Sequence, residues 1–370
     1  MLRMSAGSPL GCALREQRDA LGCSAERLAA LSELPVDRVL ALEQGAQATT
    51  REIAKLASAL AVDPAALWRG EVSLPRTTAR FRAPSGVASL AEGDARLLAR
   101  AAEAGRVLAH LRSLRGEEAA SVVARRRVSG VAGWPEPWDQ GYRLGARLRA
   151  DLGPGKAPIP SVQRLLEEHG VHVAWSAFES SDVIAASLYE PGAAPVILLN
   201  TRSPRARARL SRRAVLAHEL CHLVVDGGET DLLTLVSRGV DATEVEQRAN
   251  GFAPSFIVPG GWISPHTTNV RQLALDVATE WGLSFEGALW HLKNAQHIGA
   301  RDVEEELRRE AVVIPEGAFE GDIERREPAH LRLDVTIGPL AYGALSDVTL
   351  GAFEADMISR GRAVEILALA

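Results

Sequence analysis

Residues 214–225 read AVLAHELCHLVV, an apolar, helix-forming run with two histidines and a glutamate in the order HExxH. Each residue of an α-helix turns by about 100°, so His218 and His222 lie on one face, one turn apart. Two imidazoles placed in this way can bind one metal ion, and Glu219 beside them can take a proton from water at that ion. Imidazole and carboxylate ligands favour zinc, whose open fourth position lowers the pKa of bound water to about 7.

The residues around this motif predict that the helix is buried. HExxH also arises by chance in long proteins, where its histidines only cap or line a helix. In this chain apolar residues occupy nearly every side of the helix: Val215, Leu216, Leu220, Leu223, Val224 and Val225. Burying two histidines and a glutamate without partners costs several kcal/mol, and a metal site removes that objection.

A third protein ligand is expected, because catalytic zinc sites take three. The next strongly helical stretch, residues 242–256, offers Glu244 and Glu246. HELCH followed by EQRANGFAPSFIVP at residues 246–259 resembles the ImmA/IrrE family of zinc metallopeptidases, which carry HELxH and then ExxANxFAxxLLxP.

This resemblance implies one zinc ion per chain, Glu219 as the catalytic glutamate, and three metal ligands: His218, His222 and Glu246. It extends upstream, where PIPSVQRLLEEHGVHV at residues 158–173 and PVILLN at residues 195–200 resemble segments that precede the metal helix in that family. Together these segments cover roughly the middle of the chain.

Three positions depart from the family pattern: Cys221, Arg248 and Pro254. Cys221 replaces the common glycine of HELGH, Arg248 stands where Glu or Gln is usual, and a proline interrupts the second helix. These departures bear on the level of activity more than on metal binding.

Composition predicts a multidomain protein of the cytoplasm. The chain has 370 residues, more than a usual single domain. Its net charge of −5 argues against wholesale binding to nucleic acid, though not against a local basic face. An odd number of scattered cysteines is typical of reduced thiols: Cys12, Cys23 and Cys221. No signal-peptide core and no run of transmembrane length is present, so we expect a soluble protein without membrane contact.

The N-terminal part has apolar residues at helical spacing, typical of four or five short helices. SAERLAALSELPVDRVLALEQG at residues 24–45 resembles the helix-turn-helix of Cro/repressor-type (XRE) regulators. The resemblance implies a five-helix domain over residues 1–72, with a first helix at residues 24–31 and a recognition helix at residues 36–44. A linker rich in Pro, Gly, Ser and Thr follows at residues 73–89.

Whether this module reads DNA is a separate question from its fold. Only Arg38 and Gln44 suit base edges or phosphates, and phosphate would repel Asp37. Residues 10–70 carry seven basic side chains against eight acidic ones. We expect DNA binding, and a helical docking or dimerisation module is the alternative.

Two arginine-rich runs offer further contacts for nucleic acid or an acidic partner. Residues 125–127 are Arg-Arg-Arg, and residues 202–213 contain six arginines directly before the metal helix. Such runs usually form solvated surfaces, which is the alternative interpretation.

The predicted metallopeptidase domain spans residues 90–300, and short strands at residues 171–178, 185–189 and 196–199 predict a small sheet on the metal helix. We expect residues 185–189 to be an edge strand that pairs with an extended substrate. The candidate substrate-binding residues are therefore Ala185, Ser187 and Tyr189.

The remaining stretches predict helices and a small C-terminal region. Residues 267–296 read as a helical pair that packs over the cleft. Three histidines near it are candidates for stabilising an oxyanion, or are ordinary core and surface side chains: His266, His291 and His297. Residues 301–370 predict a separate α+β region, with strands at 311–314 and 331–337 and a final helix at 352–367. The whole chain is predicted to be α+β and mainly helical.

The resemblance implies a cytoplasmic zinc endopeptidase that cleaves a helix-turn-helix repressor and so triggers a stress, phage-defence or mobile-element response. The alternative is a DNA-binding regulator whose metallopeptidase domain senses a ligand or metal with little turnover. A toxin–antitoxin or immunity component that acts by protein contact is a third interpretation, and homodimer formation stays open.

Overall fold

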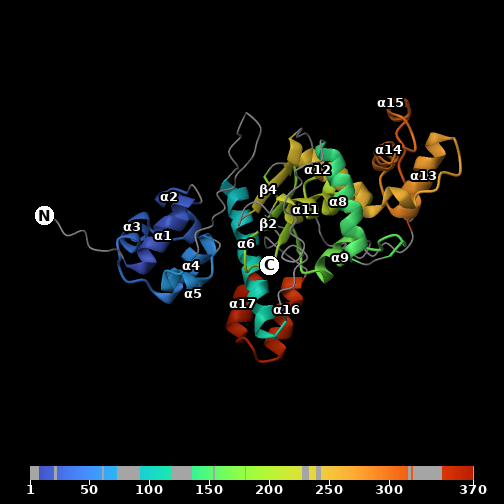
Figure 1. Ribbon diagram of the computed structural model, residues 1–370. Coiled ribbons are helices and arrows are strands. Elements are labelled where there is room, and N and C mark those ends of the chain that lie inside the picture. The colour runs from blue at the N-terminus through green and yellow to red at the C-terminus, as the bar shows by residue number, and fades with distance from the viewer. Residues whose placement is uncertain are drawn as a thin grey trace.

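The chain is mainly helical with one small mixed sheet, so the predicted α+β class is confirmed (Figure 1). This computed structural model describes residues 8–20, 23–60, 62–72, 92–117, 136–152, 155–179, 181–226, 233–238, 243–315, 318–319 and 344–369. The predicted linker at 73–89, the arginines at 125–127 and the predicted strand at 331–337 lie outside these ranges. None of the described helices combines the length and apolar character needed to cross a lipid bilayer.

Five short helices form the N-terminal unit and enclose a core of their own. They are α1 (Pro9–Ala20), α2 (Ala25–Ser32), α3 (Val36–Glu43), α4 (Thr50–Leu60) and α5 (Pro64–Arg69). The Ser24 side chain accepts the backbone N–H of Arg27 and begins α2, while α2 ends at Glu33 with a positive φ of 51°. A glutamate thus occupies a left-handed backbone position that favours glycine.

The sheet has the strand order β1-β3-β2-β4. Its strands are β1 (His172–Ser176), β2 (Val183–Tyr189), β3 (Val196–Asn200) and β4 (Leu233–Arg238). β1 and β3 are parallel, and β2 is antiparallel to both β3 and β4. The predicted edge strand was therefore wrong, because β2 is buried at every position and forms ladders on both sides. β4, which the sequence pattern did not predict, is the edge strand on that side.

Helices cover both faces of the sheet (Figure 1). One face packs on α9 (Val162–Glu168), α11 (Arg209–Val224), α12 (Glu244–Ile257) and their neighbours. The opposite face packs on α6 (Glu92–Leu114) together with α16 (Ala344–Glu354) and α17 (Arg360–Leu369). Successive side chains of a strand point to opposite faces of the sheet, so each strand contributes to both cores. Ala185 lies in the core with α11 and α12, and Ala186 lies in the core with α6.

The two described helices near the C-terminus, α16 and α17, pack into a core that they share with the sheet. Leu345, Ala352 and Ile366 share a core with α6 and the sheet strands. Residues 311–315 have no regular secondary structure, so the strand predicted at 311–314 is absent, and two helices replace the single final helix. α15 (Ala300–Arg308) instead joins the first core through Val303. An amphipathic helix can complete a distant core as readily as a local one, and the sequence pattern does not tell these cases apart.

A close helix crossing joins α8 (Pro137–Leu152) to α12. A Cβ atom on Gly141 would overlap the carbonyl of Arg248, and one on Gly145 would overlap that of Phe252. From the other side, a Cβ on Gly251 would overlap the carbonyl of Trp138. Glycine is required at these positions because the two backbones touch directly.

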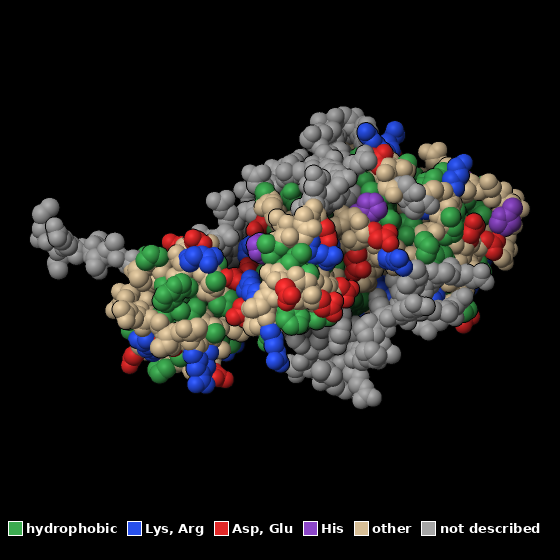
Figure 2. Space-filling model, turned by 90° about the horizontal axis from the view of Figure 1, so that it is seen from below, with side chains coloured by type: hydrophobic (Ala, Val, Ile, Leu, Met, Phe, Trp, Pro, Cys, Tyr) green, Lys and Arg blue, Asp and Glu red, His purple; other side chains and the backbone are tan. Residues whose placement is uncertain are grey.

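The N-terminal unit contacts the rest of the molecule through α4 and α5. Arg96 on α6 donates to the carbonyl of Ala59 over 3.2 Å, and Arg362 on α17 forms an ion pair with Asp63. Ala99 of α6 also completes the core of the five helices. α3 lies on the far side of the unit from α6 (Figure 1). On the face seen in Figure 2, basic and acidic side chains are mixed over the five helices rather than gathered in a basic stripe.

Candidate metal centre

Two helices that cross over the sheet carry the predicted metal ligands. α11 is buried by Leu216, Leu220 and Leu223, which fixes the rotation of the helix and therefore the face that carries His218 and His222. α12 begins at Thr243, whose hydroxyl accepts the backbone N–H of Glu246 over 3.4 Å. This cap places Glu246 in the first turn of α12.

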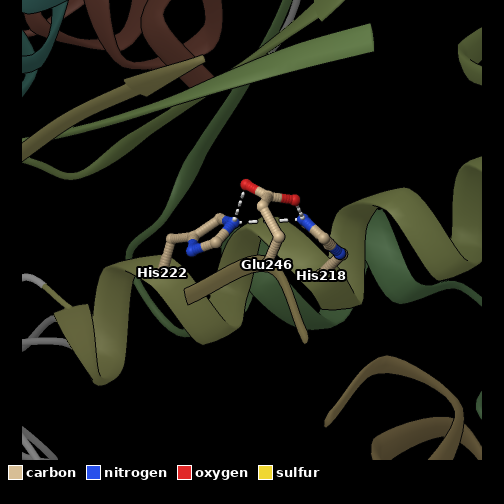
Figure 3. A group of neighbouring side chains, drawn as sticks. All are labelled: His218, His222 and Glu246. Carbon is tan, nitrogen blue, oxygen red and sulfur yellow. Dashed lines mark hydrogen bonds and ion pairs between the residues drawn. The ribbon is translucent and has the colours of Figure 1, made fainter. Parts of the chain in front are cut away.

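The three predicted ligands converge (Figure 3). His218 Nε2 lies 3.0 Å from His222 Nε2 and 3.1 Å from Glu246 Oε2. His222 Nε2 lies 3.5 Å from Glu246 Oε1. Ligand atoms at about 2.0–2.1 Å from a tetrahedral zinc ion are separated from one another by about 3.3 Å. The donor set and its spacing therefore fit a zinc ion.

Burial and charge shift the pKa values of two of these ligands in opposite directions. Burial by itself would lower the pKa of His222, but hydrogen bonds with Asp226 and Glu246 raise it to about 10. Burial would raise the pKa of Glu246, yet the hydrogen bonds of both histidines hold it well below its usual value. A proton and a metal ion thus compete for the same group of atoms.

Asp226, which the sequence interpretation did not include, orients one ligand. His222 Nδ1 lies 2.7 Å from Asp226 Oδ2, so this nitrogen donates and Nε2 is left to bind a metal. Asp226 follows His222 by four residues, at the end of α11. That i,i+4 spacing was the available sequence signal.

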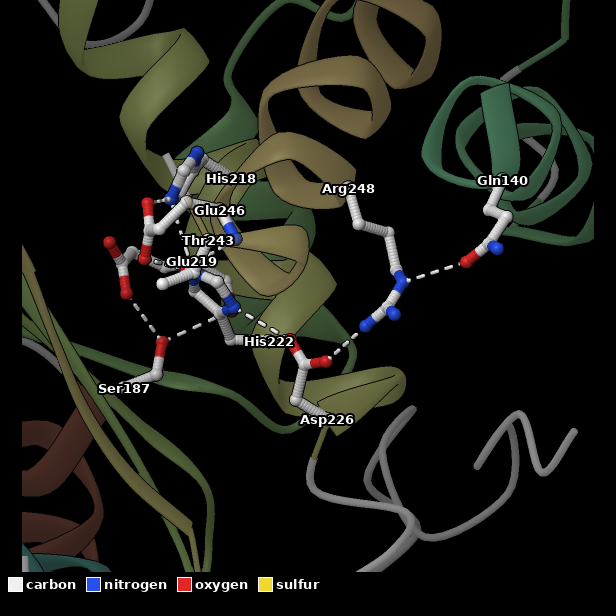
Figure 4. Close-up of polar contacts among 9 residues, drawn as sticks. All are labelled: Gln140, Ser187, His218, Glu219, His222, Asp226, Thr243, Glu246 and Arg248. Atoms are coloured by element: carbon white, nitrogen blue, oxygen red, sulfur yellow. Dashed lines mark hydrogen bonds and ion pairs between the residues drawn. The ribbon is translucent and has the colours of Figure 1, made fainter. Parts of the chain in front are cut away.

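A serine of the sheet strand β2 binds the carboxylate of Glu219. Ser187 Oγ lies 2.7 Å from Glu219 Oε2 and 3.1 Å from the Glu219 carbonyl, while Oε1 has no hydrogen-bond partner among the described residues (Figure 4). Ser187 was predicted as a substrate contact on an edge strand. It is instead a buried residue of the inner strand β2 that orients the carboxylate, and Ala185 and Tyr189 on the same face belong to the core.

A cavity of about 480 Å³ is lined by two of the three ligands, His218 and Glu246, and by Glu219, whereas His222 is not part of its lining. Its walls are formed by α11, α12 and α14 (Phe285–Asn294), and residues spaced by three or four along α11 form one stripe: Ser211, Ala214, Val215, His218 and Glu219. α13 (Val270–Trp281) and α14 are the helical pair that was predicted at residues 267–296. The half-exposed Trp290 of α14 lines the cavity.

The three histidines considered for an oxyanion role do not line this cavity. His291 is fully buried beside Tyr142, and burial lowers its pKa to about 3. His266 pairs with Asp276 at the surface, and His297 lies against the carbonyl of Gly260. The oxyanion prediction therefore has no support in the geometry.

The predicted DNA contacts lie far from this centre, on α3. Arg38 Nε donates to Glu52 Oε1 over 2.6 Å, and its Nη2 donates to Glu52 Oε2 over 3.0 Å and to the carbonyl of Gln47 over 2.7 Å. Gln44 is exposed at the end of α3. The guanidinium of Arg38 is thus engaged within the unit, and Gln44 faces solvent.

The arginine-rich segment before the metal helix divides into two groups. Arg212 and Arg213 are buried, and Arg213 donates to the carbonyls of Gly282 and Ile159. Other members of the segment are exposed: Arg202, Arg205 and Arg207. Arg213 therefore connects the start of α11 to the end of α13 and to the loop before α9.

Residues 166–293 match the Peptidase_M78 family, described as the IrrE N-terminal-like domain. The matched range contains all four strands, α11, α12 and both helices of the pair, and therefore the whole candidate metal centre. No curated protein and no solved structure matches the chain. The match supports a metallopeptidase-type domain in the middle of the chain and agrees with the resemblance found in its motifs.

Proposed function

We propose that this protein is a cytoplasmic zinc endopeptidase that cleaves another protein, a helix-turn-helix transcriptional repressor, and thereby triggers a stress, phage-defence or mobile-element response. One observation carries the proposal. Three ligand atoms lie at zinc spacing, and two of the ligands, His218 and Glu246, line one cavity together with Glu219, whose Oε1 has no hydrogen-bond partner in the described part of the chain. The repressor as substrate rests on the family resemblance alone.

A zinc ion held by His218, His222 and Glu246 supplies Lewis-acid chemistry, because it polarises a peptide carbonyl and acidifies water. Glu219 then acts as the general base. Its free Oε1 accepts a proton from the attacking water and afterwards passes that proton to the leaving amine nitrogen. Ser187 holds the other oxygen, so the carboxylate keeps one orientation through both transfers.

The substrate chain binds beside β4 in this proposal, instead of β2. Leu235 of β4 pairs with Ser187, so the edge strand runs about 4.8 Å from the serine that contacts Glu219. The stripe on α11 continues from His218 back to Ser211, about 10 Å along the helix axis. That length accommodates about three residues of extended substrate on one side of the scissile bond.

The first test measures bound metal in protein purified without added zinc. We expect about one zinc per wild-type chain and a large loss in both His222→Ala and Glu246→Ala. Glu219→Gln should keep the metal and lose about 10²–10⁴-fold in the rate of repressor cleavage. Absence of metal from the wild type, even after zinc is supplied, would overturn the proposal, and cleavage retained by Glu219→Gln would remove Glu219 from the mechanism.

The second candidate function is a DNA-binding regulator whose metallopeptidase domain senses a metal or ligand. The placement of α3 on the far side from α6 favours it, since DNA can approach without displacing the rest of the chain. A gel-shift assay on the DNA upstream of the gene, repeated at several salt concentrations, tests it. Tight binding that weakens steeply with salt would favour the regulator, and binding without any site preference would count against it.

A further inference from the structure

A chain of hydrogen bonds leads from the metal ligand His222 to a helix that contributes no ligand (Figure 4). His222 Nδ1 donates to Asp226 Oδ2 over 2.7 Å. Arg248 Nη1 donates to Asp226 Oδ1 over 2.6 Å, and Arg248 Nε donates to Gln140 Oε1 over 3.2 Å. The chain thus joins the end of α11, the first half of α12 and α8.

These groups lie in a largely buried environment. The exposed fractions are 0% for the His222 side chain, 10% for Asp226 and 12% for Arg248. Hydrogen bonds between ions are strong in such surroundings, and a buried carboxylate without a cationic partner is costly. Arg248 therefore holds the carboxylate of Asp226 in the orientation that its hydrogen bond with His222 requires.

α8 contacts Arg248 at two places. Gln140 accepts from the guanidinium, and the neighbouring Gly141 packs directly on the Arg248 carbonyl. The contact at Gly141 leaves no room for a methyl group, so the distance between α8 and this part of α12 is fixed. Glu246 stands only two residues before Arg248 on the same helix.

We propose that Arg248 is a positioning residue of the metal centre, held in place by α8 through Gln140. It orients Asp226, which in turn aims His222 Nε2 at the metal, and it does so from the position where the resembling family carries Glu or Gln. A planar guanidinium serves this role because its separate N–H groups reach Asp226 and Gln140 at the same time. The inference rests on the proposed zinc binding.

The experiment measures the zinc dissociation constant of the full chain by competition with a chromophoric chelator. Arg248→Gln should raise it about 10–100-fold, because outer partners of metal-ligating histidines typically contribute that much. Arg248→Lys and Gln140→Ala should raise it by smaller factors, since a single ammonium cannot reproduce both hydrogen bonds. Arg143→Gln is the matched control. It removes an exposed arginine of α8, the helix of Gln140, that forms an ion pair with Asp139, and it should leave zinc affinity unchanged.

Cobalt substitution gives a second readout that a purely structural role would not change. The visible absorption of bound cobalt should shift in Arg248→Gln and stay as in the wild type in Arg143→Gln. If Arg248→Gln does not fold, Arg248→Lys and Gln140→Ala decide the matter. Wild-type zinc affinity and cobalt spectra in every folded variant would overturn the inference, whereas a wild-type chain that binds no zinc would overturn the proposed function itself.

Discussion

α11 and α3 each carry the motif from which their part of the chain was interpreted, but their polar side chains have different surroundings. On α11, His218 and His222 meet Glu246 from another helix, and their Nε2 atoms converge on one point. On α3, Arg38 forms a bidentate ion pair with Glu52 inside the same unit. A motif forms a binding site only when the surrounding structure brings its polar atoms together and leaves them able to bind a ligand. The histidines of α11 meet this condition, whereas the guanidinium of Arg38 is already bound to Glu52.

Among the tests of this contrast, the largest effect is expected from breaking the ion pair that holds α3 in its unit. Glu43 is 4% exposed and accepts from Arg18 Nε over 2.6 Å and from Nη2 over 3.2 Å. Glu43→Gln should lower the free energy of unfolding of the N-terminal unit by about 3 kcal/mol, because Arg18 loses its buried partner. Urea denaturation measures this change.

The control for that prediction is Glu33→Gln, which removes an exposed partner of Lys55 and should leave the urea denaturation midpoint nearly unchanged. Zinc affinity should be equal in both variants. If Glu43→Gln also weakened zinc binding, the contrast between α3 and α11 would fail, since the two regions would then fold as one unit.

A second prediction concerns the orientation of Glu219. Ser187→Ala removes the donor to Glu219 Oε2 and should lower kcat about 10–30-fold, which corresponds to about 1.4–2 kcal/mol, with bound zinc unchanged. Ser255→Ala is a matched control, because it deletes another buried serine hydrogen bond, to the Tyr142 carbonyl. Equal rates in the two variants would show that Ser187 serves packing only.

A third prediction follows from the raised pKa of His222. Its pKa of about 10 means that without zinc the site carries a proton at neutral pH, which zinc must displace. Zinc affinity should therefore increase about tenfold per pH unit between pH 6 and 8, and level off as the pH approaches 10. Chelator competition across this range measures the slope. An affinity independent of pH would contradict the hydrogen bonds assigned to His222, and Glu43→Gln should leave the slope as it is.

The smallest effect is expected at Arg38. Arg38→Ala should leave the urea denaturation midpoint nearly unchanged, since its ion pair with Glu52 is partly exposed. Glu52→Gln leaves Arg38 in place and frees its charge, so any DNA binding through α3 should tighten severalfold at low salt. Gel shifts of the two variants against the wild type test this. A DNA affinity that neither substitution alters would exclude Arg38 as a phosphate contact.

Local patterns predicted those parts of the site that lie on one helix or follow a family motif. The i,i+4 spacing predicted the histidine pair, and the resemblance supplied Glu246. Ser187 was singled out for the wrong reason, because the pattern of residues 185–189 does not say whether a strand lies at an edge or inside a sheet. The role of Asp226 was missed although it follows His222 by four residues, and the role of Gln140 was missed because nothing in its own neighbourhood identifies Arg248 as its partner.

The burial of α11 and the placement of two imidazoles on one of its faces could be predicted from the sequence, because helix periodicity and apolar flanks are local properties. Three features follow only from how distant segments pack: the edge position of β4, the hydrogen bond from the Ser187 hydroxyl to Glu219, and the contact of α8 with Arg248. These contacts join residues up to about a hundred positions apart. They depend on how the helices pack on the sheet, and chain periodicity carries no information about that packing.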